Sequence, residues 1–192
     1  MTTGLYSPSC APVFCNDLAL GDAVMYEVVK FLHVFIAIIW IGGAFGAIFV
    51  GTLAHRRSDT AAVLSTVRNI SIMAKFIFMP ASVVLLVLGA ILVWEAWSFF
   101  DAWVVIGIIG VVLTGLIGAL ILTPMVEQVT AASDDAVAAP IAARLLQAAR
   151  ADQVLLAVVV WDMVSKPNWS DFVEIAVMAI IVAVAAAPIF RK

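Results

Sequence analysis

A single histidine interrupts the first long apolar run of the chain, and it is the first candidate for chemistry. His33 stands in the stretch KFLHVFIAIIWIGG, where Lys30 is the only other ionisable residue. An ionisable side chain within a membrane indicates a functional site, because hydrocarbon offers it no partner. Neutral imidazole is also the commonest side-chain ligand of metals, and it binds haem iron. His33 is therefore a candidate haem ligand; the alternative is a histidine that hydrogen-bonds a neighbouring helix.

Charged residues at helical spacing surround this histidine and recur later in the chain. Glu27, Lys30 and His33 are three residues apart, so they share one face of a helix. Asp162 and Lys166 are four residues apart and also share a face. If the two helices pack together, Lys30, His33, Asp162 and Lys166 form one cluster. Such a cluster could hold the propionates of a porphyrin, relay a proton, or only neutralise its own charges.

A second polar group combines Lys75 with Arg150 and Asp152. Basic residues at the cytoplasmic ends of membrane helices commonly extend to lipid phosphates. We therefore expect a structural role for this group.

Both cysteines, Cys10 and Cys15, lie in the segment CAPVFC ahead of the first apolar run. On the oxidising side of a membrane, a disulfide that closes this short loop is chemically sensible. Two free thiols, or a metal site completed by Met25, are the alternatives.

The composition requires lipid as the solvent. Of the 192 residues, 65% are hydrophobic and only 12% are charged, whereas soluble domains have about half and about a quarter. The formal net charge is -3, and no run of Lys or Arg could follow a phosphate backbone, so nucleic acid is not expected as a partner. The lipid bilayer is the expected surrounding.

Five stretches are long and apolar enough to span a hydrocarbon core, which needs about 20 helical residues. The fourth stretch is interrupted by Asp152 and Asp162, and it is therefore the span in which we expect function. The predicted spans are residues 26–53, 72–97, 102–126, 145–164 and 172–190.

Basic residues predict the orientation, because cytoplasmic ends of spans carry an excess of Lys and Arg. With the N-terminus outside, two of the ten basic residues, Lys30 and Lys166, lie on the outer side. The other eight lie on the inner side: Arg56, Arg57, Arg68, Lys75, Arg144, Arg150, Arg191 and Lys192. We expect a multi-pass protein of the bacterial inner membrane with a periplasmic N-terminus and a cytoplasmic C-terminus.

Short connections predict which spans are neighbours. The links WSFFD and SKPNWSD are too short for anything but antiparallel helices. The expected fold is an all-α membrane bundle with a four-helix core and a fifth C-terminal transmembrane helix. Residues 1–22 form the predicted periplasmic tail, and residues 23–192 form a single transmembrane domain.

Small residues recur at intervals of four in two spans. Gly42 and Gly46 share a face of the first span, and Gly110, Thr114 and Gly118 share a face of the third. Small residues let helix backbones approach closely in membranes. They predict either close packing within one subunit or a homodimer interface.

Two stretches resemble a known family. KFLHVFIAIIWIGG and RADQVLLAVVVWDMVSKP resemble an uncharacterised family of bacterial integral membrane proteins with a K-x-x-H first helix and an M-V-x-K-P ending to the fourth. That family is more distantly similar to the HemJ-type protoporphyrinogen oxidases and to the copper-resistance CopD-like membrane domains. The resemblance covers residues 26–167.

The resemblance implies a fold and a cofactor. In HemJ-type enzymes the first-helix histidine binds b-type haem and a lysine before proline closes the fourth helix, and by position these roles fall on His33 and Lys166. The Asn-Glu pair that opens the fourth helix of those enzymes is replaced by Ala151 and Asp152. The resemblance therefore implies the fold and a haem, and not the oxidase activity.

Three functions are compatible with these features. The first is a b-haem or other redox membrane protein, with His33 as ligand and Lys30, Asp162 and Lys166 around the cofactor. The second is a non-catalytic accessory subunit of a larger respiratory or photosynthetic membrane complex. The third is a transporter of a metal or small solute. No nucleophile triad, P-loop or HExxH motif decides whether the chain is an enzyme.

Overall fold

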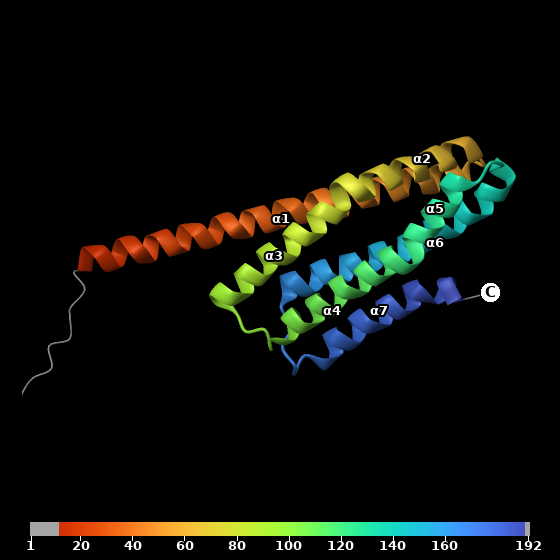
Figure 1. Ribbon diagram of the computed structural model, residues 1–192. Coiled ribbons are helices and arrows are strands. Elements are labelled where there is room, and N and C mark those ends of the chain that lie inside the picture. The colour runs from red at the N-terminus through yellow and green to blue at the C-terminus, as the bar shows by residue number, and fades with distance from the viewer. Residues whose placement is uncertain (1–11, 191–192) are drawn as a thin grey trace, which may run out of the picture.

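The computed structural model describes residues 12–190, with side chains from Ala23 to Ala187, and these residues form helices and no strands (Figure 1). Cys10 lies outside the described residues and the side chain of Cys15 is not described, so their disulfide stays a prediction. The helices are α1 Pro12–Arg56, α2 Thr60–Met73, η1 Ala74–Phe78, α3 Met79–Ala96, α4 Ala102–Ile117, η2 Gly118–Leu122, α5 Thr123–Ala131, α6 Asp135–Ser165 and α7 Phe172–Phe190.

Two wide π-helical turns, η1 and η2, keep long helices continuous through prolines. Pro80 and Pro124 lie just after them, and each proline lacks an N–H and crowds the carbonyl four residues earlier. A π turn, which bonds over five residues, accommodates that missing bond. α2, η1 and α3 thus form one column over residues 60–96, and α4, η2 and α5 form another over residues 102–131.

Three of the five predicted spans are long and apolar enough to cross a membrane. They lie in the helices over Ala23–Arg56, Thr60–Ala96 and Ala102–Ala131. α7 is apolar over Phe172–Ala187 but shorter. α6 is long, but Arg150, Asp152 and Asp162 interrupt its apolar stretch. The fourth and fifth spans and the orientation stay predictions.

α1 is much longer than the expected span. It begins at Pro12, within the predicted tail, and has 45 residues, which corresponds to about 68 Å of helix. The hydrocarbon layer is about 30 Å thick. α1 therefore extends out of the layer at one end or both, and Figure 1 shows its first turns projecting beyond the other helices.

α6 is the central helix. It packs against α1, α2, α4, α5 and α7, whereas α3 packs mainly on α1. The two helices joined by the WSFFD link, α3 and α4, therefore do not pack along their length. The glycine-containing face of α4 is covered by α6 instead, because Gly110 meets Val159 and Gly107 meets Met163.

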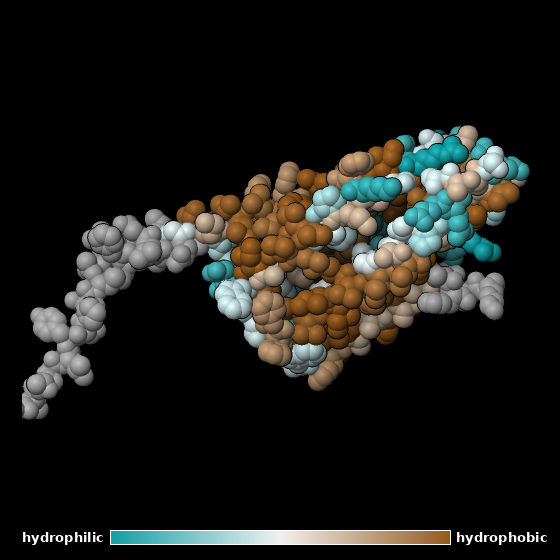
Figure 2. Space-filling view, viewed as in Figure 1, coloured by the Kyte–Doolittle hydropathy of each residue, from teal (hydrophilic) through white to brown (hydrophobic). Residues whose placement is uncertain are grey.

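The bundle has two chemically different ends. The arginine end carries Arg56, Arg57, Arg68 and Arg144, and hydrophilic residues gather over α2 and α5 there, while the rest of the visible face is mostly hydrophobic (Figure 2). The tryptophan end contains the turns 97–101 and 166–171, with Trp97, Trp103 and Trp169.

Three apolar clusters hold the bundle together. The cluster in the middle contains Trp40, Leu85 and Leu156, and the cluster at the tryptophan end contains Val93, Trp103 and Val104. The cluster at the arginine end is the largest and contains Ala54, Val63, Leu64, Val67, Val129, Ala138, Ala142, Leu145 and Leu146.

Candidate functional site

His33 lies at the interface of α1 with α3, opposite Gly89. A Cβ atom at Gly89 would lie 3.1 Å from Cε1 and 3.6 Å from Nδ1 of His33. The backbone carbonyl of Leu85 is nearby. The Nδ1 atom is buried and has no hydrogen-bond partner. Gly89 thus makes room for an imidazole beside the Leu85 carbonyl, which is an acceptor for a proton on the ring.

Asp162 is the most deeply buried charged residue of α6. It is 0% exposed, and both of its carboxyl oxygens lack a hydrogen-bond partner. Its Oδ2 atom lies 3.5 Å from the position of a Cβ atom at Gly107 of α4. Here too a glycine makes room for an ionisable side chain, because any larger residue would meet Asp162 and Met163.

His33 and Asp162 lie at one level of the bundle. α1 and α6 run antiparallel, with Gly51 of α1 against Leu146 of α6 and Trp40 clustered with Leu156. When this antiparallel pairing is continued toward the tryptophan end, His33 of α1 lies level with Asp162 of α6. We call these two residues, with Gly89 and Gly107 opposite them, the polar layer. It lies beyond the middle apolar cluster and next to the cluster at the tryptophan end.

A second buried carboxyl group lies ten residues earlier in α6, toward the arginine end. Asp152 is 8% exposed and lies beside Thr114 of α4. Asp152 Oδ1 and Thr114 Oγ1 are both buried, and neither has a hydrogen-bond partner other than its neighbour across the interface. Arg150, the expected neighbour, donates from Nε to the carbonyl of Leu146 at 3.2 Å, and Lys75 is exposed on η1.

Lys30 lies on the surface of α1. Its Nζ atom donates to Glu27 Oε1 at 2.7 Å, and the two side chains are 46% and 64% exposed. The same ammonium group lies 5.3 Å from the centroid of the Tyr26 ring. Lys30 and Glu27 thus share a face as predicted, whereas His33 turns toward α3.

Lys166 lies just beyond α6. It adopts the left-handed conformation with φ 49°, and its N–H donates to the carbonyl of Asp162 at 2.8 Å. Its Nζ atom lies 3.8 Å from the Trp97 ring centroid and 5.1 Å from that of Trp103. The helix ends at Ser165, and the Lys166 side chain lies against Trp103 of α4, one turn from Gly107, which faces Asp162.

Aromatic contacts join the two turns of the tryptophan end. Trp97 and Trp103 meet edge to face at 5.2 Å, with Lys166 against both. Trp169 Nε1 donates to the carbonyl of Phe100 at 3.1 Å. The four residues of the predicted cluster thus lie toward this end, but the side chain of each contacts a different set of residues.

The predicted packing glycines divide into two groups. Gly110 meets Val159 of α6, so it serves packing within the subunit. A Cβ atom at Gly42, Gly46 or Gly118 would have no atom within 4 Å. These three positions leave open space beside their helices.

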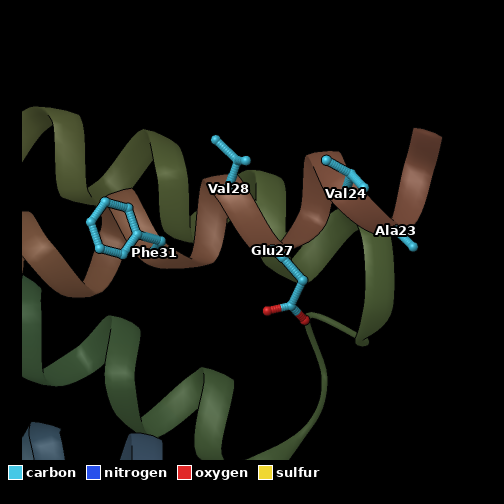
Figure 3. A pocket seen from close by; sticks show the side chains of 5 residues that line it. All are labelled: Ala23, Val24, Glu27, Val28 and Phe31. Atoms are coloured by element: carbon cyan, nitrogen blue, oxygen red, sulfur yellow. The ribbon is translucent and has the colours of Figure 1, made fainter. Parts of the chain in front are cut away.

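A small cavity lies between α1 and α3 toward the tryptophan end. Its volume is about 80 Å³, and its lining is Met25, Tyr26, Val29, Ile91, Leu92 and Glu95. A larger hollow of about 390 Å³ is a surface groove, because its lining residues, Ala23, Val24, Glu27, Val28 and Phe31, all come from α1 (Figure 3). Among the described side chains, no three His, Cys, Asp or Glu residues gather to hold a metal ion.

The partners of the candidate residues were not predicted from the sequence. Gly89 and Gly107 face His33 and Asp162, and Trp97 and Trp103 hold Lys166. A lone glycine within an apolar helix indicates close approach of another group, and that signal was present at Gly89. Which group approaches it could not be read from spacing.

A comparison with protein families covers most of this site. The profile described as "Predicted integral membrane protein (DUF2269)" matches residues 27–167, from Glu27 to Pro167. The match includes the polar layer and Lys166 and leaves α7 outside. No curated protein and no solved structure is significantly similar to the chain. Because the matched region makes up most of the chain, the protein belongs to the DUF2269 family of predicted integral membrane proteins.

Proposed function

We propose that this protein transfers protons within the membrane, with Asp162 and His33 as the groups that bind them. The observation that carries the proposal is the carboxyl group of Asp162, which is fully buried and has no partner on either oxygen. An unpaired carboxylate in an apolar interior is so costly that the group takes up a proton instead. Chains of Asp, Glu and His in membrane helices commonly form proton relays.

Asp152 supports a path along α6. It precedes Asp162 by ten residues, which is a rise of about 15 Å, or about half the hydrocarbon layer. Both carboxyl groups face α4, at Thr114 and Gly107. In each step a protonated carboxyl group gives its proton to a water molecule on one side and takes another proton from the opposite side. No atom is consumed, and the driving force is the electrochemical gradient of protons, which includes the membrane potential.

The test is proton flux in vesicles. The purified protein is reconstituted with an internal pH-sensitive dye, and a potassium diffusion potential drives protons. Wild type should acidify the lumen faster than empty vesicles, and Asp162→Asn should reduce that flux about tenfold or more. The exposed carboxylate variant Glu127→Gln is the matched control and should retain the flux. Flux equal to that of empty vesicles, or full flux in Asp162→Asn, would refute the proposal.

Binding of b-type haem at His33 is a second candidate. The buried Nδ1 atom of His33 favours it, and the resemblance to HemJ-type enzymes points to the same residue. The neighbouring cavity of about 80 Å³ is much smaller than a porphyrin, and Lys166 is already held by Trp97. The described residues therefore offer a ligand atom but no porphyrin pocket, and we derive no electron-transfer step through a haem.

An absorption spectrum tests this candidate. A reduced-minus-oxidised difference spectrum of the gently solubilised protein should contain a b-type band that His33→Ala removes and His55→Ala, at an exposed histidine, retains. A colourless protein rules out the haem. If it also co-purifies with other membrane proteins in fixed ratio, an accessory role is favoured.

A further inference from the structure

The small cavity between α1 and α3 lies directly in line with His33. These helices run antiparallel, with Gly43 of α1 facing Phe78 of α3 and His33 facing Gly89. One turn further toward the tryptophan end the same register brings Val29 opposite Leu92, and the next turn brings Tyr26 opposite Glu95. All four of these residues line the cavity. Its inner end is thus one helical turn, about 5 Å, from the imidazole.

The two helices separate where the cavity forms. Figure 1 shows α3 diverging from α1 toward the turn that leads to α4. A volume of about 80 Å³ has room for a few water molecules. Waters in such a space need polar partners, and the outer part of the lining provides the Tyr26 hydroxyl group and the Glu95 carboxylate.

The mouth of the cavity is charged. Glu95 is exposed, and the ammonium group of Lys30 lies 5.3 Å from the ring of Tyr26 while it is paired with Glu27. Glu95 gives the lining of the cavity a negative charge, and the neighbouring pair of Lys30 and Glu27 is neutral as a whole. Such a mouth favours cations, including protons, over anions.

We propose that this cavity is a water-filled vestibule through which protons reach His33. Its mouth lies at Tyr26 and Glu95, and its inner end lies at Val29 and Leu92. A proton taken from bulk water passes along the enclosed waters to a ring nitrogen of His33. What the protein does with this proton rests on the proposed function. The presence of water in the vestibule does not depend on that function.

Cysteine labelling tests the vestibule without any flux measurement. In a chain with Cys10 and Cys15 changed to Ser, Val29→Cys should react with a cationic, membrane-impermeant methanethiosulfonate about tenfold faster than Val28→Cys. Val28 is the matched control, because it lies next to Val29 in the helix but on the face of the surface groove. Equal rates, or faster labelling at position 28, would overturn the vestibule.

The charge of the mouth gives a second readout. Labelling rates of the Val29→Cys variant, normalised to those of a free thiol, should be several-fold higher for the cationic reagent than for an anionic methanethiosulfonate. Glu95→Gln should reduce that preference, and an unchanged preference would overturn the role of Glu95. If Val29→Cys fails to fold, Leu92→Cys serves instead, because Leu92 lines the same inner end.

Hydrogen exchange connects the vestibule to His33 itself. Exchange at the imidazole carbon between the two nitrogens, followed by mass spectrometry, should slow several-fold in Val29→Phe, which fills the cavity, and should be unchanged in Val28→Phe. Equal exchange in both variants would overturn the connection. If labelling and exchange behave as expected while wild-type vesicles carry no flux, only the proposed function fails.

Discussion

His33 and Gly89 face each other so closely that a Cβ atom at Gly89 would lie 3.1 Å from Cε1 of His33. The two residues come from different helices, α1 and α3, and both lie within the region that matches the family. Asp162 and Gly107 repeat the arrangement between α6 and α4. In both pairs, an ionisable side chain enters an apolar interface at the point where the opposite helix has no side chain.

Gly89→Ala should destabilise the protein. The added methyl group would crowd His33, so the imidazole or the helix must shift, at a cost of about 1 to 2 kcal/mol. Gly115→Ala is the control, because no atom lies within 4 Å of its Cβ position. There the better helix propensity of alanine should stabilise by about 0.5 to 1 kcal/mol. Thermal unfolding in detergent, monitored by circular dichroism, measures both effects. If the unfolding temperature of Gly89→Ala rose as much as that of Gly115→Ala, the close contact between Gly89 and His33 would be contradicted.

Asp162→Leu should make the protein more stable and inactive. Replacing a buried carboxyl group that has no partner with an apolar side chain of similar size removes a desolvation cost of about 1 to 3 kcal/mol. Asp59 provides the contrast, since its Oδ1 accepts the N–H of Ala62 at 3.0 Å and caps α2. Asp59→Ala should lower stability by about 1 kcal/mol. A large loss of stability in Asp162→Leu would mean that the carboxyl group has a structural partner.

Lys166→Met should loosen the tryptophan end. The ammonium group over Trp97 and Trp103 contributes about 1 to 2 kcal/mol in a partly buried setting, and methionine keeps the length without the charge. Lys166→Arg should retain most of the stability. Thermal unfolding and tryptophan fluorescence measure the effect, with Lys75→Met at an exposed lysine as the control. The idea fails if both lysine-to-methionine variants behave alike.

The orientation of the bundle can be measured with fusions. The distribution of basic residues predicts that the tryptophan end is periplasmic and the C-terminus cytoplasmic. Alkaline phosphatase fused after Phe100 should therefore be active, and after Lys192 inactive. A green fluorescent protein should give the opposite pattern. A reversed pattern would turn the mouth of the vestibule toward the cytoplasm.

The class of protein and the residues of interest follow from the amino-acid sequence alone. The apolar content and the length of the apolar runs predict a helical membrane protein, because in hydrocarbon the backbone must form its hydrogen bonds within each helix. The cost of burying charge then singled out His33 and Asp162 without any structure. The match of residues 27–167 to a family of predicted integral membrane proteins agrees with that class.

Which residues meet depends on the tertiary structure. Periodicity gives the face of a helix but not its neighbour, so it could not reveal that α6 is central or that α3 packs on α1 rather than along α4. Helical spacing grouped Lys166 with Asp162, but it could not reveal that the Lys166 side chain contacts Trp97 and Trp103. Contacts between residues distant in the chain depend on how whole helix surfaces fit together, and in this bundle helices approach closely at the glycines at positions 51, 89, 107 and 110.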